Sequence, residues 1–171
     1  MAEIYLAGGC FWGAEKYFSL INGVTETTVG YAAGEKTNRY SGSPTYEEVC
    51  TGETGLAETV RVCYDPEKLS LKKLLLLFFE VIDPTAVNRQ AHDVGTQYRS
   101  AIYYTVSSNI TVIDEVVDII QRQYSAPVAT ECDKLGAFYE AEEYHKKYLD
   151  KNPGGYCHIG RSAFERAKNA N

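Results

Sequence analysis

The sequence has few basic residues, a single methionine and no long apolar segment. Its 171 residues include 17 Lys and Arg against 23 Asp and Glu, which gives a net charge of −6. A chain with this balance lacks the basic face that attracts nucleic acid or an anionic membrane. The longest apolar run, from Leu74 to Phe79, is far shorter than the ~20 residues that cross a bilayer. We therefore expect neither nucleic acid nor a membrane as a partner.

The sequence also lacks a signal peptide and any CxxC pair. The first residues show no basic stretch followed by an apolar one, so a cytoplasmic protein is expected. The five cysteines are an odd number, which is not typical of a disulfide framework. Without CxxC spacing, zinc ribbons and thioredoxin-like motifs are disfavoured, and the three histidines add no metal-ligand spacing. We expect no metal site.

Strand and helix patterns alternate irregularly along the chain. Alternating or short apolar runs predict strands over 3–6, 25–31, 59–64 and 99–105. Helical spacing predicts helices over 14–21, 70–82, 109–124 and 138–149, with Ser70 as an N-cap. Residues 33–46 and 85–97 are predicted to be loops. Without repeats or long linkers, this order indicates one α/β domain around a mixed sheet.

Cys10 follows the first predicted strand and precedes the first predicted helix, between Gly9 and Gly13. The thiolate is the reactive form, and a free thiol has a pKa of about 8.5. A helix N-terminus stabilises an anion by about 0.3–1 kcal/mol, so it lowers the pKa by roughly one unit at most. The glycines leave room for a tight turn or an open substrate path. A reactive thiol and a buried structural cysteine are equally compatible with these residues.

The other cysteines differ in their surroundings. Cys50, Cys63 and Cys132 lie in predicted elements or polar segments, and structural roles are expected for them. Cys157 follows a Pro-Gly-Gly-Tyr stretch at residues 153–156. A thiol on a mobile segment can reach a second sulfur, as thiol–disulfide exchange requires.

Distinct short motifs are distributed from about residue 4 to residue 157. They are GCFWG at 9–13, PTYEEVC at 44–50, TGLAE at 54–58, YDP at 64–66, DPT at 83–85, NRQ at 88–90, DVGTQYRS at 93–100, AE at 141–142, YH at 144–145, KNP at 151–153 and GYC at 155–157. In this order they resemble the peptide methionine sulfoxide reductase A family. The resemblance implies reduction of methionine S-sulfoxide, free or in peptides and proteins, and so repair of oxidised proteins.

The resemblance also implies a role for each matched residue. Cys10 matches the nucleophile, and Glu58 matches the acid that serves the sulfoxide oxygen. Tyr46 and Tyr98 match hydroxyls that bind this oxygen, and Asp93 matches a polar member of the same site. The remaining matches are Phe11 and Trp12 as walls of the methyl pocket, Cys157 as the resolving cysteine and Tyr156 beside the pocket.

For the fold, the resemblance implies an α/β (α+β) two-layer sandwich with a mixed β-sheet, a ferredoxin-like core and a coiled C-terminal segment. One catalytic domain is expected over 1–171, with an α/β core at 1–150 and a segment at 151–171 that carries the resolving cysteine. A monomer without metal or organic cofactor is expected, with thioredoxin as the external dithiol reductant.

The chemistry sets requirements on these residues. The oxygen of a sulfoxide leaves only when it is protonated, and a carboxylic acid beside the thiol can supply the proton. Burial and a neighbouring thiolate both raise the pKa of Glu58, and a rise of about two units brings it near neutral pH. Cys10 then becomes a sulfenic acid, Cys157 condenses with it, and a dithiol restores both thiols.

The sequence departs from the family pattern in three places. Leu56 stands where the family usually has His, and Ala91 stands where it usually has Gly. No cysteine follows Cys157, so a second C-terminal relay thiol is not expected, although Cys50, Cys63 or Cys132 could replace it.

Two other functions are compatible with parts of the sequence. In a thiol hydrolase, Cys10 would be the acyl nucleophile with His92 or His145 as base, although His145 is expected to be solvated on a charged helical face. In a peptide-binding module, an aromatic pocket would bind oxidised methionine without turnover, and Cys157 would have no role.

Overall fold

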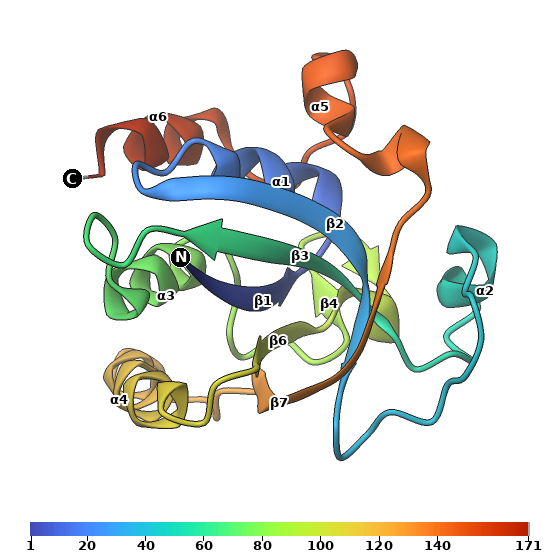
Figure 1. Cartoon of the computed structure of the whole chain (residues 1–171), viewed down its shortest axis with the longest axis horizontal. Coiled ribbons are helices and arrows are strands. Elements are labelled where there is room, and N and C mark those ends of the chain that lie inside the picture. Colours follow the sequence, from blue (N-terminus) through green and yellow to red (C-terminus); the bar gives the residue numbers. More distant parts are fainter. Residues whose placement is uncertain (171) are drawn as a thin grey trace.

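The computed structural model describes residues 1–170, so Asn171, the last residue of the predicted domain, lies outside the described part. The strands are β1 (Ala2–Gly8), β2 (Val24–Gly34), β3 (Ala57–Tyr64), β4 (Arg89–Gln90), β5 (Asp93–Val94), β6 (Ser100–Tyr104) and β7 (Glu131–Glu140) (Figure 1). The helices are α1 (Phe11–Ser19), α2 (Tyr46–Cys50), α3 (Leu71–Phe79), α4 (Asn109–Gln121), α5 (Tyr148–Lys151) and α6 (Arg161–Asn169). Two short 3-10 helices, η1 and η2, cover Thr96–Tyr98 and Glu143–His145. Across residues 1–170, no helix is long and apolar enough to span a membrane.

The main sheet is mixed, as expected, and it closes into a barrel. Its strand order is β1-β3-β2-β7-β6, and β6 also pairs with β1. All pairs are antiparallel except β6 with β7. This closure differs from the layered sandwich implied by the resemblance. One face of the strands carries mainly small side chains, Ala7, Ala32, Ala57 and Ala101, with Tyr5 and Tyr103 between them, and small interior residues allow tight curling.

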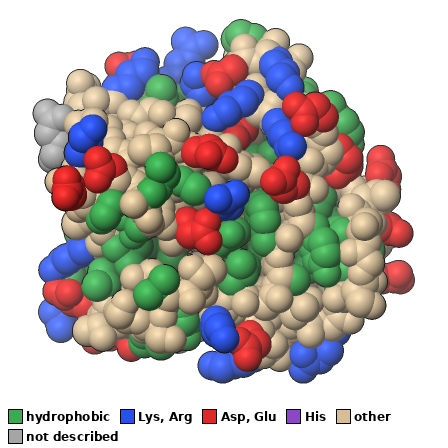
Figure 2. Space-filling view, in the orientation of Figure 1, with side chains coloured by type: hydrophobic (Ala, Val, Ile, Leu, Met, Phe, Trp, Pro, Cys, Tyr) green, Lys and Arg blue, Asp and Glu red, His purple; other side chains and the backbone are tan. Residues whose placement is uncertain are grey.

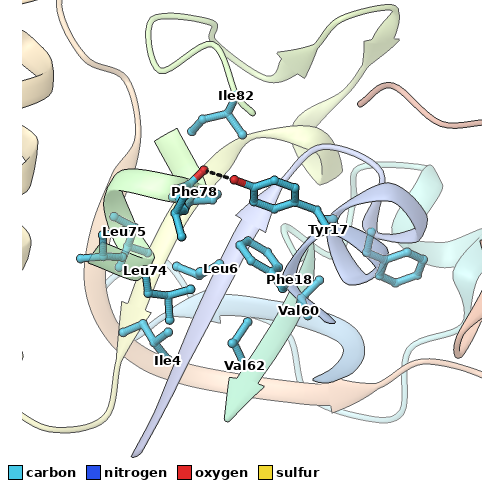
Figure 3. Close-up of a cluster of buried hydrophobic side chains, with 14 of the residues drawn as sticks. Ile4, Leu6, Tyr17, Phe18, Val60, Val62, Leu74, Leu75, Phe78 and Ile82 are labelled. Atoms are coloured by element: carbon cyan, nitrogen blue, oxygen red, sulfur yellow. Dashed lines mark hydrogen bonds between the residues drawn. The ribbon is translucent and has the colours of Figure 1, made fainter. Parts of the chain in front are cut away.

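The opposite face of the strands packs against helices and forms the larger core. Alternate residues of β1 and β3 point to this face, as the pleat of a strand requires, and they meet α1 and α3 (Figure 3). The buried side chains drawn there include Ile4, Leu6, Tyr17, Phe18, Val60, Val62, Leu74, Leu75 and Phe78. Full burial of each such apolar side chain contributes about 1.5–3 kcal/mol. On the surface, acidic and basic side chains are interspersed in the view of Figure 2.

Several predicted elements are confirmed with shifted ends, and one is wrong. Ser70 caps α3, because its hydroxyl accepts a hydrogen bond from the backbone N–H of Lys73 at 3.2 Å. The helix predicted over 138–149 does not form. Its first residues belong to β7, which pairs with β2 on one side and with β6 on the other. Residues 138–140 lie in the ladder with β2, whereas the ladder with β6 uses 131–134, and pairing within the sheet outweighs a short isolated helix, which is marginal by itself.

The C-terminal segment is more ordered than the expected coil. Helix α6 lies within it, and Ala163 and Ala167 are buried in the larger core. The preceding part is tied down by Glu15 of α1, whose side chain is 3% exposed. Its carboxylate accepts hydrogen bonds from Thr27 Oγ1 at 3.1 Å and from the backbone N–H of Lys147 at 2.6 Å. Since Lys147 directly precedes α5, this buried carboxylate fixes α5 against α1.

A buried hydrogen bond within the larger core provides a test of the packing. The Tyr17 hydroxyl donates to the carbonyl of Leu77 at 2.8 Å and joins α1 to α3 (Figure 3). Tyr17→Phe is expected to lower the free energy of unfolding by about 1 kcal/mol, the net value of one such bond. Urea titration measures the change. Tyr124→Phe removes a hydroxyl from a side chain that is 39% exposed and is expected to have no effect. Equal losses in the two variants would contradict this assignment.

Candidate active site

Cys10 lies at the junction that the sequence predicts. It is the N-cap residue of α1 and directly follows a turn in which Gly9 has φ +82°, a conformation that glycine adopts without strain. The Cys10 side chain is 7% exposed. The thiol is therefore almost enclosed at the start of a helix.

The expected lowering of the Cys10 pKa is wrong. Burial raises the pKa of the thiol, and the nearby Glu58 carboxyl raises it further. A hydrogen bond from the backbone N–H of Trp12 acts in the opposite direction but is the weaker influence. Because desolvation outweighs the helix terminus, the raised pKa favours the protonated thiol of Cys10 at neutral pH.

Glu58 is a buried carboxyl beside the first turn of α1. Its side chain is 1% exposed, and Oε1 accepts a hydrogen bond from the backbone N–H of Phe11 at 3.2 Å. Burial raises the pKa of Glu58 to about 8, Asp93 contributes in the same direction, and the Phe11 bond opposes both. Oε2 is buried and has no partner within residues 1–170. A protonated carboxyl with one unpaired oxygen can donate a hydrogen bond, and then a proton, to a ligand.

Two tyrosines lie beside this carboxyl. Tyr46 begins α2, which is held by a capping box between Thr45 and Glu48, and Tyr98 ends η1. Burial is the main cause that raises the pKa of both hydroxyls, the neighbouring Cys50 thiol adds to it for Tyr46, and any ionisation of Glu58 raises both further. Both therefore stay protonated and available as hydrogen-bond donors.

The aromatic residues Phe11 and Trp12 meet a buried histidine. His145 is 1% exposed, which makes the expected solvated position wrong. Its Nδ1 accepts a hydrogen bond from Trp12 Nε1 at 3.0 Å, and its ring centroid lies 4.6 Å from that of Tyr46. Tyr148 stacks on Trp12 with centroids 3.7 Å apart and an interplanar angle of 12°. These contacts hold the indole in one orientation.

The sequence offered His145 only as the base of an alternative hydrolase and gave no role to Tyr148. The only signal for His145 was its place in the matched YH motif, and Tyr148 had none. Glu142 of the same segment holds two other parts of the chain together. It accepts hydrogen bonds from the Tyr31 hydroxyl at 2.9 Å and from the backbone N–H of Tyr46 at 3.1 Å. It thereby fixes the start of α2 relative to the aromatic cluster.

Asp93 and Tyr156 connect the β4–β5 hairpin to the C-terminal segment. The Tyr156 hydroxyl donates to Asp93 Oδ2 at 3.0 Å. The next residue, Cys157, is partly buried, and a Cβ built on Gly13 would lie only 2.8 Å from its Sγ. Cys157 therefore reaches the first turn of the helix that begins after Cys10. All five cysteines are unpaired in the described chain.

The three remaining cysteines and Leu56 lie outside the group of residues described above. Cys50 is exposed at the end of α2, the helix that Tyr46 begins, whereas Cys63 and Cys132 lie on β3 and β7. Leu56 is 1% exposed and belongs to the larger core. Within residues 1–170, no group of three or more His, Cys, Asp or Glu side chains could hold a metal ion.

Ala91 lies in a backbone conformation that favours glycine. It has φ +51° in the turn between β4 and β5, in the left-handed region that L side chains disfavour. Asp93, a predicted site residue, lies on β5 directly after this turn. Backbone strain at Ala91 therefore falls within the hairpin that positions Asp93.

Comparison with known proteins gives concordant results. A family profile described as peptide methionine sulfoxide reductase matches residues 2–171. A protein of Lachnoclostridium phytofermentans named peptide methionine sulfoxide reductase MsrA is 56% identical over 167 residues, covering 98% of each chain. The crystal structure of reduced Mxr1 from Saccharomyces cerevisiae matches with a TM-score of 0.85 and 37% identity, over 92% of this chain and 90% of that one. Mxr1 in complex with Trx2 matches with a TM-score of 0.60 and 26% identity, over 85% and 83% of the chains.

The buried Glu58 carboxyl makes stability depend on pH. Between the unperturbed pKa of 4.5 and about 8, the folded chain binds a proton that the unfolded chain has lost, so stability falls as pH rises. Glu58→Gln removes this titration. Wild type therefore loses stability from about pH 5 to about pH 8, whereas the variant does not. We expect the difference in free energy of unfolding, variant minus wild type, to rise by up to several kcal/mol over this range. Denaturant titrations across this range measure it, with the exposed Glu53→Gln as control. A pH-independent difference would disprove the raised pKa.

Proposed function

Because the chain belongs to the peptide methionine sulfoxide reductase A family, we propose that Cys10 is the residue that reduces methionine S-sulfoxide in its substrates. The activity is that of an oxidoreductase that returns oxidised methionine to methionine. One observation carries the assignment of residues. Cys10 caps the helix whose first backbone N–H, that of Phe11, donates to Oε1 of the buried Glu58 carboxyl. The other oxygen of this carboxyl, Oε2, has no partner in the described residues.

Substrate binding uses two kinds of surface. The sulfoxide methyl group packs against Phe11 and Trp12, which the contacts of His145 and Tyr148 hold in place. The sulfoxide oxygen turns toward Glu58 Oε2 and the hydroxyls of Tyr46 and Tyr98. Three protonated donors around one oxygen polarise the S–O bond before it breaks.

The reductive step then conserves atoms and protons. The Cys10 sulfur attacks the sulfoxide sulfur, and Glu58 donates its proton to the oxygen. The oxygen transfers to Cys10, so the thiol becomes a sulfenic acid as the sulfoxide becomes methionine. The proton lost by the Cys10 thiol restores the Glu58 carboxyl. Overall, one thiol and one sulfoxide give one sulfenic acid and one thioether, without net proton uptake.

Recycling uses Cys157 and an external dithiol. The Cys157 sulfur displaces the hydroxyl of the Cys10 sulfenic acid as water and forms a disulfide, which thioredoxin reduces by thiol–disulfide exchange. Access from outside is available, because Cys157 lines an open groove of about 740 Å³ together with residues that include Ile159 and Phe164. The Mxr1 complex with Trx2 supports a partner of this kind. No further cofactor is needed for this cycle.

The hydrolase and binding-module alternatives have less support. His92 is exposed, and His145 Nδ1 already accepts the Trp12 hydrogen bond, so neither imidazole has a hydrogen bond to Cys10. A binding module would give no function to Cys157 or to the raised pKa of Glu58.

The activity and the two thiol roles are tested in one experiment. Turnover of separate S and R epimers of a blocked methionine sulfoxide is measured with dithiothreitol and then with thioredoxin. Wild type is expected to consume the S epimer only, and Cys10→Ser to consume neither, since it lacks the nucleophile. Cys157→Ser is expected to turn over with dithiothreitol, which reduces a sulfenic acid directly, but to stop after one turnover with thioredoxin.

Cys50→Ser is the matched control, because Cys50 is an exposed thiol near Tyr46 that the cycle does not use. Full activity of Cys10→Ser would disprove the function of Cys10. Sustained thioredoxin-dependent turnover by Cys157→Ser would disprove only its resolving role, and loss of that turnover when Cys50→Ser is added to Cys157→Ser would show that Cys50 replaces it.

A further inference from the structure

His158 is a partly buried histidine that the cycle described above does not use. It follows Cys157, and its ring packs against the segment that carries Cys10. A Cβ on Gly9 would lie 3.0 Å from its Nε2, and a Cβ on Gly13 would lie 3.4 Å from its Nδ1. The imidazole is thus placed beside both ends of the predicted disulfide.

The single hydrogen bond of the His158 ring defines which nitrogen carries the hydrogen. Nε2 lies 3.0 Å from the carbonyl oxygen of Gly8, and a carbonyl can only accept, so Nε2 carries the hydrogen. Burial is the main influence on the ring and lowers the pKa of His158, which keeps it neutral near pH 7. Nδ1 therefore has a free lone pair. This atom is buried and has no hydrogen-bond partner within residues 1–170.

The Cys157 thiol needs an acceptor for its proton. Burial raises the pKa of Cys157, yet the thiolate is the form that attacks another sulfur. At rest the thiol donates to the carbonyl of Ile159 at 3.3 Å, and a peptide carbonyl is too weak a base to remove the proton. The same Cβ position on Gly13 lies 2.8 Å from Cys157 Sγ and 3.4 Å from His158 Nδ1. The thiol and the unpaired nitrogen therefore face one small gap beside α1.

We propose that His158 Nδ1 accepts the proton of the Cys157 thiol when the disulfide with Cys10 forms. The inference rests on the proposed function and adds a residue to its second step. The Cys157 sulfur attacks the Cys10 sulfenic sulfur, an S–S bond forms and the S–O bond breaks. The thiol sulfur is oxidised and the sulfenic sulfur is reduced. The hydroxyl leaves as water after taking a proton from Glu58, and the proton held by His158 returns through solvent to the Glu58 carboxylate.

The groups around the ring suit a transient positive charge. On its own segment its neighbour is the Cys157 thiol, the end of β1 presents the Gly8 carbonyl, and Asp93 faces it from β5. Both the Gly8 carbonyl and the Asp93 carboxylate favour the protonated ring and oppose the effect of burial. His158 can therefore hold a proton briefly without being charged at rest.

His158→Gln separates the two properties of the residue. The glutamine amide can still donate to the Gly8 carbonyl, but it has no basic nitrogen. Each enzyme is mixed with excess methionine S-sulfoxide without reductant, quenched with acid at timed intervals, and analysed by mass spectrometry for the Cys10–Cys157 disulfide. Methionine release is measured in the same samples, and a cyclic 1,3-diketone traps the sulfenic acid.

We expect the first equivalent of methionine to form at the wild-type rate in His158→Gln. Disulfide formation near neutral pH should slow by about 100-fold, the lower range for loss of a general base, and sulfenic acid should accumulate. The deficit should shrink at alkaline pH, where the Cys157 thiol ionises unaided. His92→Gln, which alters an exposed histidine, should behave as wild type. His158→Ala should regain disulfide formation in proportion to added imidazole.

The outcomes separate this inference from the proposed function. Wild-type disulfide rates in His158→Gln, or a deficit equal at every pH and unaffected by imidazole in His158→Ala, would overturn the base role and leave the reductase intact. Methionine release without any Cys10–Cys157 disulfide in wild type would overturn the resolving step and this inference with it. Absence of methionine release in wild type would overturn the proposed function as well.

Discussion

The site depends on one hydrogen bond, from the backbone N–H of Phe11 to the carboxyl of Glu58. It joins the first turn of α1 to β3 and so sets the distance between the cysteine that caps α1 and the buried carboxyl. Because β1 pairs with β3 in the register Leu6 with Val60, the strand that leads into Cys10 runs beside the strand that carries Glu58. Burial then raises the pKa of both groups, which favours the neutral carboxyl and the protonated thiol.

The second constraint is the path of the chain after β7. Glu15 fixes Lys147 at the start of α5, Tyr148 stacks on Trp12, and His145 accepts the indole hydrogen bond. The same segment continues to Tyr156 and Cys157, which lie against the β4–β5 hairpin and the first turn of α1. One ordered segment therefore holds the Trp12 indole in place and carries the Cys157 thiol to the first turn of α1.

Local patterns predicted the parts of the structure whose causes are local. The strand-to-helix junction at Cys10 and the Ser70 cap depend on neighbouring residues, and both are confirmed. The helix predicted over 138–149 is wrong, because pairing of 138–140 with β2, a strand distant in the sequence, overrode its apparent helical spacing. His145 looked solvated for the same reason, since the aromatic residues that bury it come from positions around 11–12 and 46.

The sequence by itself determined which reactive groups the chain contains and where they lie along it, because thiols, a carboxyl and glycines at matched motif positions are properties of residue type and spacing. It also determined that the sheet is mixed and the domain acidic. Only the tertiary structure decided the protonation states, the closure of the sheet and the location of His158 beside Cys157. Each of these depends on how the chain folds back on itself. Protonation follows from desolvation, and closure follows from the small residues inside the barrel. The place of His158 follows from contacts between segments more than 140 residues apart, such as His158 with Gly8.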